Sequence, residues 1–189
     1  MINQRKSDEV LAKGFTLLEL LIVIAILAIL ATAVVLVLNP AQYLAQSRDT
    51  QRMNDLDTVK NAINLYLATA TSVSWTPVTS CDLSAVASCT NPPTGWTIGS
   101  ASTSTAINGT GWINVPFNAL PNGSPLSKLP LDPVNGISGG VTYYYGYKSS
   151  ASQTFKLVGK LESSKYSPLM STDGGTDNNW YEVGTDMSL

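Results

Sequence analysis

Glu19 is the residue whose position most needs a chemical explanation, because it is the only charged residue in the run from 15 to 38. A carboxylate in such an apolar helix is costly in a membrane and usually has a specific partner. Lys13 lies six residues earlier, beyond the neighbouring turn of a helix. Cleavage between Gly14 and Phe15 would create an α-amino group four residues before Glu19. The new amine would supply the missing partner.

Two other groups of residues have spacings that suit known chemistry. Cys81 and Cys89 cannot complete a zinc site in a chain without His, but they can form a disulfide in an oxidising compartment. Free thiols are the alternative. Oxygen-bearing side chains gather in residues 171–179, where Asp173 and Asp177 are candidate calcium ligands. Because their spacing is not that of an EF-hand, a plain polar turn is the alternative.

The sequence contains none of the common catalytic patterns. There is no Gly-x-Ser-x-Gly elbow, no phosphate-binding loop, no Ser-x-x-Lys pair and no His for a triad. With 11 Lys+Arg against 13 Asp+Glu, the net charge of −2 argues against a strong nucleic-acid site. We therefore expect a protein that is not an enzyme and requires no cofactor, with calcium as the one ligand its residues suggest.

The run from 15 to 38 predicts a transmembrane helix. It would be about 36 Å long, enough to cross a hydrocarbon core of about 30 Å. A buried soluble helix would need a far larger protein around it, and cleavage as a secretory signal would leave residues 34–38 as an exposed apolar stub. The basic residues before the run slightly outnumber those after it, which favours a cytoplasmic N-terminus. These residues are Arg5, Lys6 and Lys13 before it, and Arg48 and Arg52 after it.

The helical pattern continues beyond Pro40, which should kink or loosen the helix. Apolar residues at a spacing of three and four predict an amphipathic helix, and they are Leu56, Val59, Ile63, Tyr66 and Leu67. The charged stretch 48–55 has two readings, a solvated helix face or contacts between subunits.

The rest of the chain predicts a loop followed by a small sheet. Residues 69–105 are rich in Ser and Thr, a composition that would allow a disordered linker, but Trp75, Trp96 and a Cys81–Cys89 disulfide favour an ordered irregular loop. Alternating residues in 141–148 and 154–161 predict an antiparallel hairpin, and a further strand is expected at 112–115. The sheet would pack on the amphipathic helix, giving an α+β fold.

The N-terminal residues resemble a known family signal. Lys13-Gly14-Phe15-Thr16-Leu17-Leu18-Glu19 and the apolar run after it are similar to the class III signal of type IV pilins and type II secretion pseudopilins. The resemblance implies removal of a leader ending at Gly14 by a membrane aspartic peptidase. It also implies methylation of the new N-terminal Phe15 and pairing of Glu19 with the terminal amine of a neighbouring subunit.

A second resemblance lies in residues 129–135, which are similar to the Pro-x-Asp-Pro turn of major secretion pseudopilins. Val134 departs from that pattern, which usually continues with an aromatic residue and Gly. Major secretion pseudopilins hold calcium in a comparable C-terminal loop, so the resemblance also favours the ligand suggested for Asp173 and Asp177.

The family resemblance implies a filament subunit with a pilin fold. The expected partners are copies of the chain itself, a prepilin peptidase and methyltransferase, an assembly ATPase with its inner-membrane platform protein, and membrane lipid before assembly. The expected location is a prokaryotic cytoplasmic membrane, with a cytoplasmic N-terminus and an extracytoplasmic head, before assembly into a periplasmic or cell-surface filament. A membrane-anchored binding module that does not polymerise, and a DNA-uptake subunit using Lys148, Lys156, Lys160 and Lys165, are the alternatives.

The expected organisation has five parts. They are a leader at 1–14, a transmembrane and filament-core helix at 15–38, an amphipathic half of the helix at 39–70, a Ser/Thr-rich connecting loop at 71–110, and a β-sheet head with a C-terminal loop at 111–189.

Overall fold

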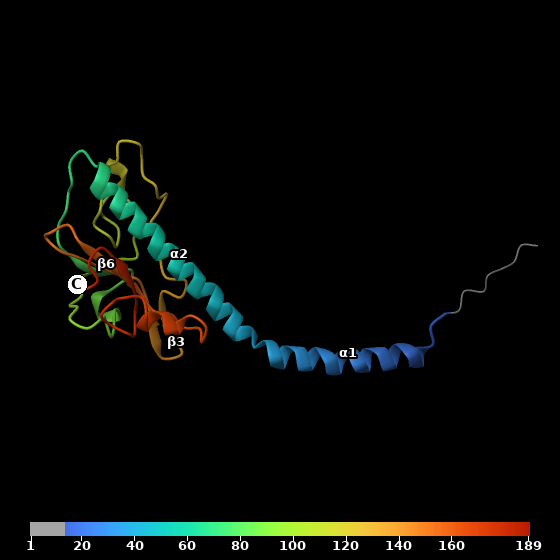
Figure 1. Ribbon diagram of the computed structural model, residues 1–189. Helices are drawn as coiled ribbons and strands as arrows, with labels where there is room; N and C mark the ends of the chain where they lie inside the picture. Colours follow the sequence, from blue (N-terminus) through green and yellow to red (C-terminus); the bar gives the residue numbers. More distant parts are fainter. Residues whose placement is uncertain (1–13) are drawn as a thin grey trace, which may run out of the picture. The chain divides into compact units, whose positions relative to one another are not determined.

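The computed structural model describes residues 14–189, except for the side chains of residues 36–38. The chain forms two units, the first ending at Pro40 and the second beginning at Ala41. The first unit contains helix α1, Leu17–Leu38. This helix of 22 residues is about 33 Å long, and its segment Leu17–Val35 is long and apolar enough to cross a membrane. The long apolar helix that the sequence predicts is therefore present (Figure 1).

Helix α1 ends at Leu38, close to Pro40, where the sequence predicts a kink or loosening of the helix. Asn39 adopts a left-handed conformation with φ 41°, and α2 (Pro40–Thr69) begins at the next residue. A proline is well tolerated in the first helical turn, where its missing N–H has no helical partner. The two helices are therefore separate elements, as the predicted loosening at Pro40 implies.

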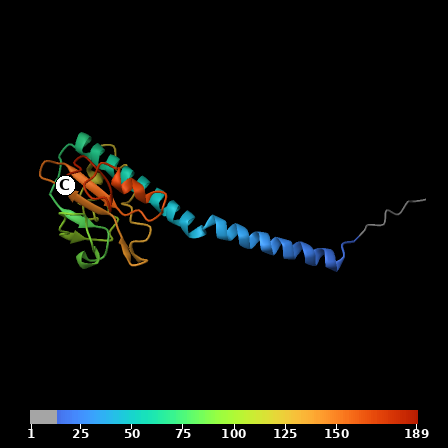
Figure 2. The ribbon, with the colours of Figure 1, turned by 60° about the horizontal axis from the view of Figure 1, so that its bottom comes forward.

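The second unit, residues 41–189, is called the globular unit below. Its α2 helix buries the predicted apolar face, with Leu56, Val59 and Ile63 fully inaccessible to solvent. The buried face also extends toward the N-terminal end of α2 through Ala45, Asp49 and Arg52, which the apolar pattern did not predict. Figures 1 and 2 both show α2 lying along the sheet of this unit.

The main sheet has five strands in the order β2-β1-β5-β6-β7. Only β1 and β2 are parallel; the other neighbouring pairs are antiparallel. A separate two-stranded sheet is formed by β3 and β4. The strands are β1 (Thr79–Cys81), β2 (Ser100–Ala101), β3 (Gly136–Ser138), β4 (Val141–Tyr143), β5 (Gly146–Ser149), β6 (Phe155–Gly159) and β7 (Tyr181–Gly184). Three 3-10 helices complete the unit: η1 (Val86–Ser88), η2 (Phe117–Ala119) and η3 (Ser167–Ser171).

The predicted hairpin is present, but its first half differs from the expectation. Strands β5 and β6 pair with Tyr147 opposite Leu157, as the alternation indicates. The run 141–148, however, is two strands that belong to different sheets. The strand expected at 112–115 is wrong: these residues form no strand, although Trp112, Ile113 and Val115 are buried.

The five-stranded sheet is covered on both faces. The helix-side core packs Leu56 and Ile63 of α2 against Phe155 and Leu157 of β6. On the other face, Val158 of β6 joins the disulfide-side core, which contains Cys81, Cys89, Leu83, Trp96, Ile98, Tyr144 and Trp180. All five residues of β6 are consequently buried, so the expectation of a half-buried strand is wrong for β6.

Candidate assembly site and polar network

The proposed processing site lies just before α1, where Thr16 and Glu19 form a reciprocal cap. Thr16 Oγ1 accepts a hydrogen bond from the Glu19 backbone N–H at 3.2 Å. In return, Glu19 Oε2 accepts the Thr16 backbone N–H at 2.8 Å and the Thr16 hydroxyl at 2.8 Å. Such a capping box satisfies two donors that the first turn of a helix otherwise leaves free. Glu19 therefore has a local role at the start of α1 in addition to its proposed role in assembly.

The described side chains of α1 form an apolar and exposed surface. Its described large apolar side chains, from Leu17 to Val35, are between 47% and 82% exposed, and Phe15 beside them is 87% exposed. A continuous exposed apolar surface of this kind requires lipid or another protein around it. Its one charged group is Glu19, at the same end as Gly14 and Phe15.

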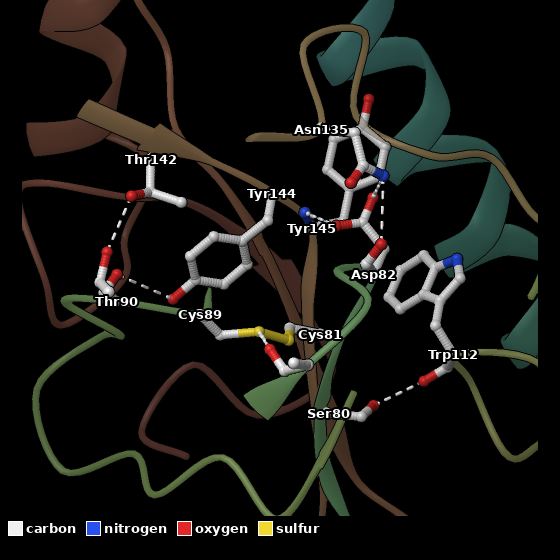
Figure 3. Close-up of a disulfide and its surroundings, with 11 residues drawn as sticks. Ser80, Cys81, Asp82, Cys89, Thr90, Trp112, Asn135, Thr142, Tyr144 and Tyr145 are labelled. Atoms are coloured by element: carbon white, nitrogen blue, oxygen red, sulfur yellow. Dashed lines mark hydrogen bonds between the residues drawn. A yellow bond between two sulfur atoms is a disulfide. The ribbon is translucent and has the colours of Figure 1, made fainter. Parts of the chain in front are cut away.

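The predicted disulfide between Cys81 and Cys89 is present, with a sequence separation of eight residues (Figure 3). Asp82, which follows Cys81, is fully buried and links β1 to the segment around Asp132 and to Tyr145. Its carboxylate accepts the backbone N–H groups of Asp132 at 2.7 Å and Tyr145 at 2.8 Å, and the side-chain amide of Asn135 at 3.4 Å. Burial raises the pKa of Asp82 to about 7, although the two backbone N–H groups act in the opposite direction.

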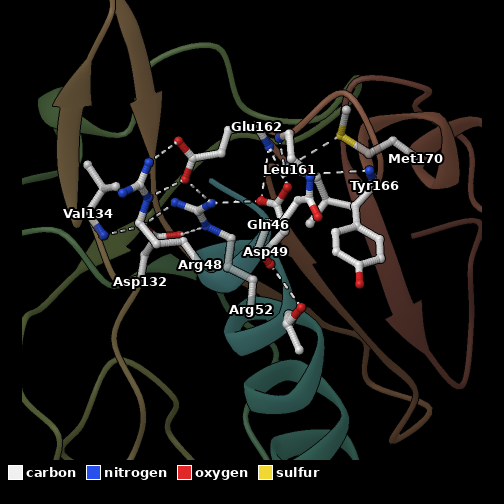
Figure 4. Close-up of polar contacts among 12 residues, drawn as sticks. Gln46, Arg48, Asp49, Arg52, Asp132, Val134, Leu161, Glu162, Tyr166 and Met170 are labelled. Carbon is white, nitrogen blue, oxygen red and sulfur yellow. Dashed lines mark hydrogen bonds and ion pairs between the residues drawn. The ribbon is translucent and has the colours of Figure 1, made fainter. Parts of the chain in front are cut away.

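A buried ion cluster holds α2 to the loops around it (Figure 4). The guanidinium of Arg52 is inaccessible to solvent and contacts Asp132 through two hydrogen bonds of 2.7 and 3.1 Å. It also donates to Asp49 at 2.9 Å and to Glu162 at 2.7 Å. Arg48 donates twice to Glu162, at 2.6 and 2.7 Å. This cluster is called the Arg52 network below.

The pKa shifts follow from these contacts. Burial alone would lower the pKa of Arg52, but hydrogen bonds and charge from Asp132 and Glu162 outweigh it and raise the pKa. Burial would raise the pKa of Glu162, yet its hydrogen bonds with Arg48 and Arg52 lower it. The interpretation of residues 48–55 as a solvated helix face is therefore wrong for Asp49 and Arg52, which are fully buried within their own chain. Asp55 also has an intramolecular partner, the Tyr145 hydroxyl at 2.9 Å.

The Pro-x-Asp-Pro turn supplies the carboxylate at the centre of this network. Asp132 Oδ1 accepts the backbone N–H groups of Val134 at 2.8 Å and Asn135 at 3.1 Å, which closes the turn. The same carboxylate accepts two hydrogen bonds from the guanidinium of Arg52. The turn is thus a structural element that anchors α2. Its hydrogen bonds are present although Val134 stands where the family pattern has an aromatic residue.

The C-terminal loop places both predicted calcium ligands near β7. Asp173 Oδ2 accepts the backbone N–H of Glu182 at 2.8 Å, and Asp177 Oδ2 accepts that of Thr94 at 2.9 Å. The second contact joins the loop to the segment that follows the disulfide. Both carboxylates thus have amide hydrogens as partners.

The four lysines of the DNA-uptake alternative do not form one exposed basic surface. Lys156 is fully buried and pairs with Glu182 at 2.9 Å. The ammonium of Lys160 lies 4.8 Å from the ring centre of Trp180, and burial lowers its pKa. Lys148 and Lys165 lie over the rings of Trp96 and Tyr166.

Comparison with known proteins identifies the N-terminal segment. Residues 11–35 match the family model of the prokaryotic N-terminal methylation motif. This motif is the class III signal, so the chain carries the signature of type IV pilins and pseudopilins, which are structural subunits. The signal implies processing by a prepilin peptidase and polymerisation into pilus-like filaments. No curated protein and no solved structure gives a significant match to the chain.

Two features of the site were missed from the sequence. The pattern Thr16-x-x-Glu19 is itself a capping-box signal and could have predicted the first. The Arg52 network joins residues separated by 80 and 110 positions, and no local pattern indicates which carboxylates will meet. One sequence signal could have indicated a buried ion pair: Arg52 lies four positions before Leu56, on the stripe of α2 that is buried.

Proposed function

We propose that this chain is a subunit of a type IV pilus-like filament or a type II secretion pseudopilus, processed between Gly14 and Phe15 and polymerised through α1. The observation that carries the proposal is the single carboxylate of Glu19 on a helix whose other surface is apolar and exposed. Cleavage would place a methylated amine at Phe15 of one subunit within reach of Glu19 of the next. The apolar surface of α1 would exchange lipid for neighbouring α1 helices.

The rest of the chain supports an extracytoplasmic location for the globular unit, with the N-terminus on the cytoplasmic side. A disulfide persists in oxidising compartments and is rare in the cytoplasm, and Cys81–Cys89 lies on the C-terminal side of α1. Assembly then requires the chain itself, a prepilin peptidase and methyltransferase, an ATPase and a membrane platform protein. The intramolecular contacts of the lysines favour this filament role over DNA capture.

Three substitutions separate assembly from helix capping. Glu19→Ala removes both the charge and the cap, Glu19→Gln removes the charge but keeps a residue that can cap, and Thr16→Ala removes the cap but keeps the charge. We expect all three proteins to enter the membrane fraction, and only Thr16→Ala to form filaments in sheared surface material viewed by electron microscopy. Mass spectrometry of the wild-type protein should find a methylated N-terminus at Phe15.

Three results would contradict the proposal. A native protein that begins at Met1 would exclude the processing step. Filaments of normal length from Glu19→Gln would show that the negative charge has no role in assembly, and wild-type membranes without filaments would favour a monomeric anchor.

A further inference from the structure

Lys156 occupies an unusual position for a lysine, because it is the second residue of β6 and is inaccessible to solvent. Its ammonium has three oxygen partners: Glu182 Oε1 at 2.9 Å, the Met187 carbonyl at 3.0 Å and Thr176 Oγ1 at 3.1 Å. A lysine ammonium has three N–H donors, so each donor has one acceptor. The three acceptors come from the C-terminal loop, from β7 and from the segment after β7.

Glu182 connects this ammonium to the backbone of the loop. While Oε1 faces Lys156, Oε2 accepts the backbone N–H groups of Thr176 and Asp177. Gly175 packs directly on the same carboxylate, and a Cβ atom there would overlap it. Lys156 therefore fixes Glu182, and Glu182 fixes the path of residues 175–177.

The donor set of the loop does not fit the calcium ion predicted for Asp173 and Asp177. Calcium takes six to eight oxygens directed at one point. Here both oxygens of Asp173 accept backbone N–H groups, from Gly175 and Glu182, and both oxygens of Asp177 accept donors from Asn179 and Thr94. Within residues 14–189, no cluster of three or more His, Cys, Asp or Glu side chains is arranged to hold a metal. The positive charge of Lys156 also disfavours a second cation beside Glu182.

We propose that the ammonium of Lys156 is a built-in cation that organises the C-terminal loop, so that the loop folds without calcium. A buried ammonium with three oxygen partners does for this loop what a bound metal does elsewhere: it gathers oxygens from separate segments around one positive charge. The proposal does not depend on polymerisation, because every contact lies within the globular unit.

The first test uses the wild-type full-length protein in detergent micelles. Thermal unfolding is followed by near-ultraviolet circular dichroism, which reports on Trp96, Trp180 and Tyr144 in the disulfide-side core. We expect the Tm to change by less than about 1 °C between excess EGTA and millimolar calcium. A calcium site filled at 100 times its Kd would raise the Tm by about 5–10 °C, and a saturable rise of that size would overturn the proposal.

The second test replaces the ammonium. Lys156→Met keeps most of the side-chain volume but leaves Glu182 buried without a cation, and we expect a Tm lower by about 10 °C and rapid proteolysis within residues 172–179. The matched control is Lys60→Met, because Lys60 also pairs with a carboxylate, at 2.6 Å from Asp57, but both side chains are partly exposed. The control should lower the Tm by no more than about 2 °C.

Equal Tm values for Lys156→Met and wild type, with the loop still resistant to protease, would refute the role of the ammonium. If Lys156→Met does not fold, the double variant with Glu182→Gln removes the unpaired carboxylate and should recover part of the loss. The calcium titration of the wild-type protein decides the question independently of either variant.

Discussion

Replacement of Arg52 by Met should destabilise the globular unit far more than replacement of Arg48, although both residues lie on α2 and both bind Glu162. Arg52 makes four hydrogen bonds and is fully buried, as are Asp49 and Asp132. Removing the guanidinium leaves these carboxylates in the interior without a cation. Breaking a buried pair in this way costs about 3–5 kcal/mol, and because the contacts share one side chain their costs do not add.

The expected loss of about 4 kcal/mol corresponds to a Tm lower by about 8–16 °C for a unit of this size. Arg48 is 35% exposed, so Arg48→Met should cost no more than about 1 kcal/mol, or about 4 °C. Urea unfolding of the full-length protein in detergent, followed by tryptophan fluorescence, measures the free energy of unfolding of both variants. The second substitution Asp132→Asn should restore part of the loss in Arg52→Met, because it removes one unpaired charge while keeping a side chain that can close the turn.

Similar stabilities for Arg52→Met and Arg48→Met would refute this reasoning. So would a double variant less stable than Arg52→Met alone, because the unpaired Asp132 charge would then not be the source of the cost.

Three further predictions concern other parts of the globular unit. Replacing Cys81 and Cys89 together by Ala should lower the free energy of unfolding by about 2.5 kcal/mol, from the loop-closure entropy of their eight-residue separation, and urea unfolding under oxidising conditions measures it. Because burial raises the pKa of Asp82 from 3.8 to about 7, the folded state holds its proton more tightly than the unfolded state. The Asp82 contribution should therefore reduce stability by up to about 4 kcal/mol as pH rises from 4 to 7 and then level off, and Asp82→Asn should abolish this slope. Gly175→Ala should displace the Glu182 carboxylate, lower the Tm by several degrees and expose the loop to protease, whereas an unchanged Tm would contradict the close packing.

The elements with strong periodic patterns were predictable from the sequence. The apolar run predicted α1, Pro40 predicted a kink or loosening where α1 and α2 are separated, and the spacing of Leu56, Val59 and Ile63 predicted the buried face of α2. The alternation in β5 and β6 predicted their pairing. In each case one local pattern carries enough information to specify the element.

The errors arose where side chains from distant segments replace regular pairing. The carboxylate of Asp82 accepts the N–H of Tyr145, and the Asp82 backbone N–H donates to the Tyr145 carbonyl. The backbone hydrogen-bonding groups of Tyr145, between β4 and β5, are therefore paired without strand pairing. Trp112 and Ile113 are consecutive and both buried, which is incompatible with the alternation of a strand covered on one face.

The sheet also lies deeper than the alternation suggested. The sequence of β6 resembles that of a half-buried strand because Lys156 interrupts its apolar residues, yet Lys156 is itself buried and paired with Glu182. The Ser/Thr-rich segment 71–110 contributes β1, β2 and much of that second core. The Trp and Cys residues of this segment indicated an ordered loop, but no alternation indicated β1 and β2, which have only three and two residues.

The Arg52 network sets an order of events during synthesis. Asp49 and Arg52 leave the ribosome well before Asp132, which is 80 residues beyond Arg52, and before the Glu162 segment, 113 residues beyond Asp49. Until those segments emerge, Arg52 has only Asp49 among its final carboxylate partners, so burial of this face of α2 would enclose an incompletely paired guanidinium. The buried face of α2 around Arg52 can therefore be completed only after the segment that carries Glu162 has been synthesised.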